Sequence, residues 1–208
     1  MRHRIGPFAV GVSLLALVSC AGQGDVIPIQ VKPILAGPDK MAKPVTSLHV
    51  VVSAFEDGRQ DKTHLGTRSH LWGGVSYFDV PGANPGEVTA QAITDYLKGN
   101  GWRAERVKPG GSLSGADVVI SGQVMELAVN AKSGIGFTKI TADAKVMMQA
   151  RNVADGSLVR MTLNGAGSDD VFWFDPEDAQ SLINQVVTES FDKLVQSTKV
   201  DNKQLRLK

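Results

Sequence analysis

The chain has one cysteine among 208 residues, few aromatic side chains (6%) and a formal net charge of only +1 at pH 7. A single thiol forms no internal disulfide, so stability must come from packing. The near balance of charge argues against a nucleic-acid partner, because phosphates require a clustered basic surface. The longest apolar stretch is also shorter than the roughly 20 residues that a membrane-spanning helix needs.

The single cysteine ends an N-terminal pattern typical of secretion. Arg2 and Arg4 precede an apolar stretch over residues 5–18, and the chain turns polar directly after Cys20. A basic start, a short apolar stretch and small residues before the cut indicate a signal peptide rather than a membrane span. The string Leu17-Val18-Ser19-Cys20 resembles the bacterial lipobox. There, signal peptidase II cuts before the cysteine, and lipid is attached to its sulfur and its new amino terminus.

We therefore predict a lipoprotein signal peptide over residues 1–19 and a covalent lipid at Cys20, with no other cofactor. Two alternatives are a secreted protein with a chance cysteine near its cleavage site and a buried structural cysteine. The acyl chains of a lipoprotein exceed the two signals that stable anchoring requires. Because Ala21 rather than Asp follows the cysteine, the sorting pattern of lipoproteins favours the inner leaflet of the outer membrane, facing the periplasm. A Gram-positive membrane anchor is the alternative.

Residues 20–47 are predicted to be a lipidated tether, because prolines recur through them and prevent both helix and central strand. The alternating Ile and Val residues leave open that part of this segment lies along a sheet edge. The length that follows suits one domain with its own hydrophobic core, which we place at residues 48–198. Residues 199–208 are basic and are predicted to fray.

Apolar periodicity and turn residues divide the domain into strands and helices. Two helix starts are marked by a capping side chain, a proline and an acid, at Asn84-Pro85-Gly86-Glu87 and Asp175-Pro176-Glu177-Asp178. Gly134-Ile135-Gly136 and Asp155-Gly156 predict hairpin turns. The predicted strands are 48–55, 102–107, 117–127, 138–152 and 158–168, and the predicted helices begin at 84 and 175.

These elements predict an α+β fold with the order β-α-β-β-β-β-α. Two helices with one apolar face each would cover one face of a mixed, mostly antiparallel sheet, forming a single two-layer sandwich. The polar, glycine-rich segment 60–82 is long for a structureless connection, and loops of this length are usually functional or mobile.

Three strings resemble the YajG-type bacterial lipoproteins: Phe55-Glu56-Asp57-Gly58-Arg59, Leu97-Lys98-Gly99-Asn100-Gly101-Trp102 and Ala116-Asp117-Val118-Val119-Ile120-Ser121-Gly122-Gln123-Val124. More loosely, the element order is similar to the anticodon-binding-like fold of the TolB amino-terminal domain, to the curli secretion lipoprotein CsgG and to lipoprotein activators of peptidoglycan synthases. The resemblance covers most of residues 48–195 and implies a fold and a lipoprotein. It implies no catalytic residues, because none are established for YajG-type proteins.

The sequence contains no set of residues with the types and spacing of a known catalytic site. Asp57, Asp61, His64 and His70 are chemically capable of binding zinc, but the two histidines lack the spacing of a helical ligand pair. Asp57-Gly58-Arg59 instead predicts a turn in which Asp caps backbone amides and Arg59 pairs with a carboxylate. We therefore predict no metal site and no enzyme.

Aromatic residues give the most unusual composition of the domain. Phe172-Trp173-Phe174 precedes the last helix, and Trp72 and Tyr77-Phe78 lie in the long loop. Buried aromatic anchors dominate the energy of many interfaces. The alternative is that Phe172 and Phe174 point inward and only Trp173 faces outward. The predicted partner-binding residues are Trp72, Tyr77, Phe78, Phe172 and Trp173.

The sequence thus predicts a non-enzymatic, lipid-anchored module that binds an unidentified envelope partner or assists assembly. One alternative is a carrier or sensor of a small apolar envelope molecule, which needs a pocket between sheet and helices. The other is a metal-dependent wall hydrolase, which needs converging ligands around Asp57, Asp61 and His64.

Overall fold

The computed structural model describes residues 24–35, 48–82, 84–108 and 110–208. Cys20 and the predicted lipobox residues Leu17, Val18 and Ser19 lie outside the described residues, as do residues 36–47. The elements within the described ranges are β1 (Val26–Pro28), β2 (His49–Asp57), β3 (Gly66–Ser69), β4 (Val75–Asp79), α1 (Pro85–Gly99), β5 (Arg103–Arg106), β6 (Val118–Ser133), β7 (Thr138–Asn152), β8 (Leu158–Val171), α2 (Pro176–Ser197), β9 (Thr198–Asp201) and β10 (Gln204–Leu207).

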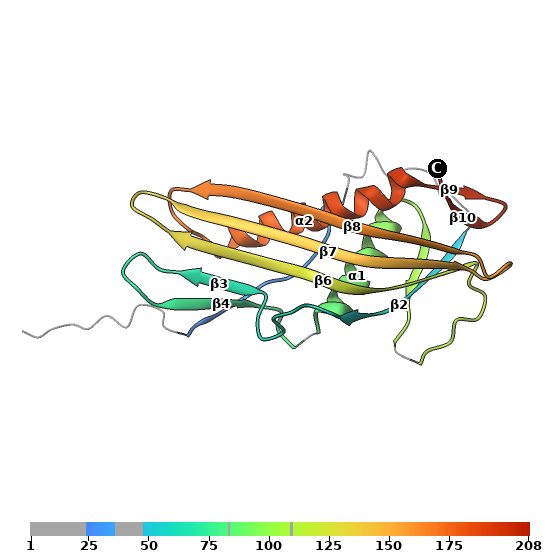
Figure 1. Ribbon diagram of the computed structural model, residues 1–208, viewed down its shortest axis with the longest axis horizontal. Coiled ribbons are helices and arrows are strands. Elements are labelled where there is room, and N and C mark those ends of the chain that lie inside the picture. The colour runs from blue at the N-terminus through green and yellow to red at the C-terminus, as the bar shows by residue number, and fades with distance from the viewer. Residues whose placement is uncertain (1–23, 36–47, 83, 109) are drawn as a thin grey trace, which may run out of the picture.

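One mixed sheet is organised around the long strand β6 (Figure 1). β6 pairs along its length with antiparallel β7, and β7 pairs in the same way with β8. On its other side β6 pairs in parallel first with β2 and then, near Ala131, with β3. β5 extends the sheet beyond β2, whereas β4 and β1 extend it beyond β3. Both smaller groups of strands therefore pair with the same edge of β6, the edge opposite β7.

The two helices pack on one face of this sheet and enclose the core. α1 lies against β2 and β5, and α2 lies against β7 and β8; Figure 1 shows both helices behind the strands. Ile93 of α1 and Phe191 of α2 are fully enclosed, in the same cluster as Ile120 and Met148 of the sheet. No helix in the described ranges is long and apolar enough to cross a membrane. The predicted α+β class is confirmed.

Both predicted helix starts are confirmed by their caps. The Asn84 side chain accepts a hydrogen bond from the Gly86 N–H at 2.7 Å. Asp175 accepts from the Glu177 N–H at 2.9 Å, and Asp178 reaches back to the Asp175 N–H at 2.9 Å. These bonds satisfy N–H groups that have no partner within the helix itself.

The predicted order β-α-β-β-β-β-α is incomplete, because it corresponds only to β2, α1, β5, β6, β7, β8 and α2. The expected loop 60–82 contains the antiparallel hairpin β3–β4. Its strands have four and five residues and are partly exposed, so they carry no long apolar run. Short, half-exposed strands at a sheet margin give only a weak periodic signal.

Residues 24–35 pack against the domain, so the prediction of a free tether is wrong for this segment. β1 pairs in parallel with β4, as the sheet-edge alternative requires. Beyond β1, the N–H groups of Gln30, Lys32 and Ile34 donate to Gln180 Oε1, Asn184 Oδ1 and Thr188 Oγ1 of α2, at 2.7, 2.8 and 2.8 Å. Every second residue of this extended segment thus bonds to every fourth residue of α2. Two extended residues advance about 6.6 Å and four helical residues about 6.0 Å, so the spacing of the backbone donors matches that of the side-chain acceptors.

The C-terminal tail is also ordered, contrary to the predicted fraying. β9 and β10 form an antiparallel hairpin whose turn residues, Asn202 and Lys203, both have positive φ (47° and 58°). Positive φ at both central residues is the requirement of a type I′ hairpin turn. Leu205 is 1% exposed and inserts into the core.

Asn152, which is fully buried, ties this hairpin to the sheet. Its Nδ2 donates to the Leu205 carbonyl at 3.0 Å, and its Oδ1 accepts from the Leu205 N–H at 2.8 Å. We expect Asn152→Ala to lower the free energy of unfolding by about 2–3 kcal/mol, because both Leu205 groups lose their partners. Denaturant unfolding measures the loss, and hydrogen exchange should rise over residues 198–207.

The exposed Asn164 on neighbouring β8 provides the control for this variant. Asn164→Ala should change stability by less than about 0.5 kcal/mol. Equal losses in the two variants, or unchanged exchange at the hairpin, would contradict the assigned role of Asn152.

Candidate functional site: a polar groove and an aromatic end

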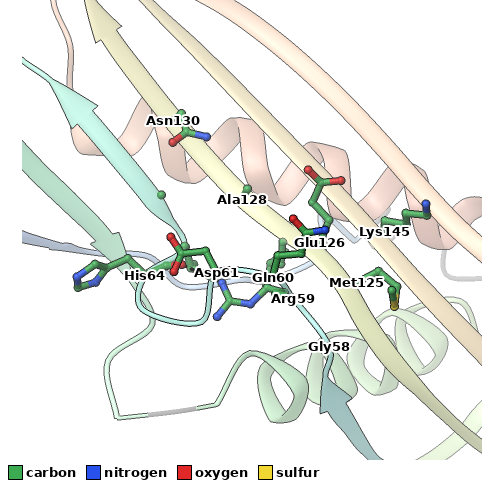
Figure 2. Close-up of a pocket in the computed structure, with 13 residues that line it drawn as sticks. Gly58, Arg59, Gln60, Asp61, His64, Met125, Glu126, Ala128, Asn130 and Lys145 are labelled. Carbon is green, nitrogen blue, oxygen red and sulfur yellow. Dashed lines mark hydrogen bonds between the residues drawn. The ribbon is translucent and has the colours of Figure 1, made fainter.

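A polar groove of about 510 Å³ lies between the loop that follows β2 and the strands β6 and β7 (Figure 2). Arg59, Asp61 and His64 come from the loop, whereas Glu126 and Lys145 face it from neighbouring strands. Figure 2 shows His64 turned away from the two sheet residues. The groove is open and charged on both walls, so it suits recognition of a polar surface.

Arg59 holds the loop wall in place rather than facing a ligand. Only 7% of Arg59 is exposed, and its Nε and Nη2 donate to the two Asp57 oxygens at 3.0 and 3.2 Å. Its Nη1 donates to the His64 carbonyl at 2.9 Å, closing the loop. The Arg59 N–H also donates to Asp57 Oδ1 at 3.1 Å, which confirms the predicted turn and identifies Asp57 as the paired carboxylate.

The electrostatics of Asp57 follow from this pairing. Burial raises the pKa of Asp57, but the hydrogen bonds and charge of Arg59 outweigh burial and leave the pKa below its ordinary value. The carboxylate therefore stays ionised and tied to the guanidinium. A carboxylate held in this way is part of the scaffold of the groove.

The four residues considered as zinc ligands are engaged separately. His64 Nδ1 lies 3.2 Å from Asp79 Oδ2, and the His64 ring stacks on Tyr77 with centroids 4.3 Å apart. His70 Nε2 lies 2.8 Å from Ser76 Oγ. Within the described ranges, no group of three or more His, Cys, Asp or Glu side chains is arranged to hold a metal ion.

The structure divides the predicted partner-binding residues into two sets. Trp72, Trp173 and Phe172 are 92%, 83% and 72% exposed. Phe78 is fully buried, so the prediction that it binds a partner is wrong; it faces the core from β4, where alternate residues point inward. Tyr77 is half-buried under His64.

The inward alternative for the aromatic segment is correct for Phe174 and wrong for Phe172. Phe174 packs against the core, 6.2 Å from Phe78 between ring centroids, and the Arg68 guanidinium lies 3.9 Å from the centre of its ring. Phe172 instead packs edge to face against Trp173, with centroids 5.5 Å apart. The segment is therefore anchored by one aromatic residue and presents the other two to the outside.

Strand register brings the exposed aromatics to the same end of the sheet. Ser69 of β3 pairs with Lys132 of β6, and Thr138 of β7 pairs with Val171 of β8. The β3–β4 turn, the β6–β7 turn and the end of β8 are consequently neighbours, at the left of Figure 1. We call this surface the aromatic end; its exposed apolar residues are Leu71, Trp72, Ile135, Phe137, Phe172 and Trp173.

Sequence reasoning missed Leu71, Ile135 and Phe137. The signal was present in the hairpin Gly134-Ile135-Gly136-Phe137, where apolar side chains occupy turn positions that normally carry polar residues. Ile135 is 88% exposed and Phe137 is 48% exposed. An apolar residue in a tight turn has no core to enter, so it indicates an outward contact.

The chain also enters the domain at the aromatic end. The Gly24 N–H donates to the Val75 carbonyl at 2.8 Å, directly after the β3–β4 turn. From there β1 runs beside β4, with Val26 opposite Tyr77. The residues that precede Gly24 in the sequence are therefore joined to the domain next to the exposed aromatics.

No family model and no curated protein matches the chain. Among solved structures, it is similar to a Xanthomonas campestris protein of the family DUF330, at 13% identity and a TM-score of 0.50, over 84% of this chain and 93% of that chain. It is also similar to the PelC dodecamer from Paraburkholderia phytofirmans, at 16% identity and a TM-score of 0.41, over 71% of this chain and 93% of that chain. At these identities, the likeness to the Xanthomonas protein shows a shared fold alone.

Proposed function

We propose that the protein is a lipid-anchored envelope lipoprotein, held by Cys20 in the inner leaflet of the outer membrane and facing the periplasm. In this proposal it is a non-enzymatic binding or assembly module, akin to the YajG-type lipoproteins that its sequence resembles, and the aromatic end binds an envelope component. The supporting observation is that the chain joins the domain at the aromatic end, where Gly24 bonds to Val75.

The spacing between Cys20 and Gly24 makes this observation informative. Gly24 is four positions after Cys20 in the sequence, and four extended residues span at most about 14 Å. A lipid on Cys20 would keep the aromatic end close to the bilayer. The polar groove lies nearer the middle of β6, around Glu126, and would then be accessible from the periplasm.

The engagement of the polar side chains supports a non-enzymatic role. Asp57 and Arg59 bind each other, and His64 is placed between Asp79 and Tyr77. A carrier for a small apolar molecule would need a cavity between sheet and helices. The largest enclosed side chains, among them Phe191, Leu194 and Ile183, occupy that space.

The sorting residue offers a sharp test of the proposed location. We expect the wild-type protein to sediment with outer membranes in a density gradient and Ala21→Asp to sediment with inner membranes, because Asp after the lipidated cysteine retains lipoproteins there. Ala21→Ser is the matched control and should stay with outer membranes. Recovery of wild type and Ala21→Asp in the same fraction would contradict the proposed sorting.

A further inference from the structure

We propose that the component bound by the aromatic end is the lipid bilayer itself: its exposed apolar side chains insert into the interfacial layer of the membrane that carries the anchor. This inference rests on the proposed anchoring at Cys20. The aromatic end would act as a second membrane contact that fixes the orientation of the domain.

Exposed apolar area is concentrated in one place, at the aromatic end. Trp72, Ile135, Trp173 and Phe172 are each at least 72% exposed and belong to three neighbouring loops. Soluble proteins rarely leave large contiguous apolar patches in water, and such patches mark interaction sites. Tryptophan is also the residue most typical of the membrane interface, because its ring has an apolar body and a polar N–H.

Backbone hydrogen bonds close two of the turns that present these side chains. The Gly134 N–H donates to the Phe137 carbonyl at 2.8 Å. In the β3–β4 turn, the His70 N–H donates to the Gly74 carbonyl at 3.1 Å, and the Gly73 N–H donates to the His70 carbonyl at 3.2 Å. Internal bonds of this kind lower the cost of moving a turn out of water.

The rim of the aromatic end has no excess of positive charge. Behind the apolar side chains, Lys132 and Lys139 are accompanied by Asp169 and Asp170, and the carboxylates of Asp25 and Asp175 are exposed as well. Such a rim gives no net attraction to anionic lipid. Insertion should therefore depend on apolar contact, occur with zwitterionic lipid alone and respond weakly to salt.

The segment that would carry the proposed anchor joins the domain at the aromatic end. Gly24 lies at this end, four residues after Cys20, so the anchor and the apolar loops approach the same surface. The opposite end of the sheet, at the β7–β8 turn, is about 50 Å away along the 15 residues of β7. A single membrane can therefore contact the anchor and the aromatic end but not the far turn.

Tryptophan fluorescence tests the contact directly. The chain has three tryptophans, and the third, Trp102, is 7% exposed within the domain. The full-length mature protein is reconstituted in phosphatidylcholine and phosphatidylethanolamine vesicles, with either brominated or ordinary acyl chains. We expect brominated lipid to remove most of the emission of Trp72 and Trp173. The variant Trp72→Ser/Trp173→Ser, which keeps Trp102, should be unaffected.

A tryptophan at the far end provides the matched control. Val153 is 47% exposed in the β7–β8 turn, and Val153→Trp in the double variant should give emission that brominated lipid does not quench. Quenching of this residue as strong as that of the aromatic end would overturn the proposed orientation. Emission of Trp72 and Trp173 that is equal in both lipids would also overturn the inference, as would their burial against a protein partner.

The mass of the N-terminal peptide separates failure of the inference from failure of the proposed anchor. A lipidated Cys20 with unquenched Trp72 and Trp173 leaves the anchor in place and refutes insertion. A Cys20 without lipid refutes the anchor, and quenching by added vesicles would then support membrane contact on its own.

Discussion

Phe78→Ala is expected to lower the free energy of unfolding by about 3–5 kcal/mol. Phe78 is fully enclosed in β4, where it joins the main core cluster and lies beside Phe174. Removing its ring takes away buried apolar contacts and leaves a cavity that a short hairpin next to the core cannot fill. Urea or guanidinium unfolding, followed by circular dichroism, measures the change in midpoint.

Trp72→Ala is the matched control, because Trp72 lies in the same hairpin and is 92% exposed. It should change stability by less than about 0.5 kcal/mol. The pair separates the structural aromatic residue from the surface aromatic residue. Equal destabilisation by both variants would mean that Trp72 packs on the domain and is unavailable to a membrane or partner.

Cys20→Ala is expected to abolish recovery of the protein in the outer-membrane fraction. Without the cysteine there is no sulfur to receive lipid, and the predicted lipobox Leu17-Val18-Ser19-Cys20 loses the residue before which the proposed cut is made. Two or more acyl chains make the difference between stable and transient attachment, so the effect should be nearly complete. Fractionation with immunodetection measures the distribution.

Stability should not change in this variant, because the proposed role of Cys20 is attachment rather than packing. Ser19→Ala is the control, since it keeps a small residue before the cut and should leave the protein in the outer membrane. Unfolding of the domain in Cys20→Ala would indicate a structural cysteine. Undiminished outer-membrane recovery of Cys20→Ala would refute the anchor.

The parts of the fold that the sequence predicted are those with strong local signals. β7 alternates between apolar and polar residues along its 15 residues, β6 begins with a continuous apolar run, and β8 alternates through Leu163; turn residues separate the three strands. Asn84 and Asp175 mark the starts of the two helices, because an N-cap depends only on residues next to it in the sequence. Such signals need no knowledge of distant parts of the chain.

β1 and the segment that follows it are stabilised by distant partners. β1 has three residues and ends at Pro28, and it pairs with a strand about 50 residues away. The backbone of Gln30 is satisfied by the side chain of Gln180, 150 residues later. Local composition left open that part of this proline-rich segment lies along a sheet edge, but neither partner could be inferred from it.

In the sequence, the predicted partner-binding aromatics lie in two separate segments, one in the expected loop 60–82 and one before the last helix. Their proximity depends on the parallel pairing of β3 with the far half of β6, which places Ser69 opposite Lys132. Because the hairpin β3–β4 was not predicted, its pairing with β6 could not be predicted. Because strand β4 was not predicted either, Tyr77 and Phe78 were grouped together as binding residues. Successive residues of a strand face opposite sides, and Phe78 is the one that points into the core.

The most direct test of the proposed account is the mass of the N-terminal peptide of the protein purified from membranes. The account predicts that the peptide begins at Cys20 and carries diacylglycerol on the sulfur, with a further acyl chain on the amine. An N-terminus at another residue, or an internal Cys20 with a free thiol, would contradict the anchor on which the proposed function depends.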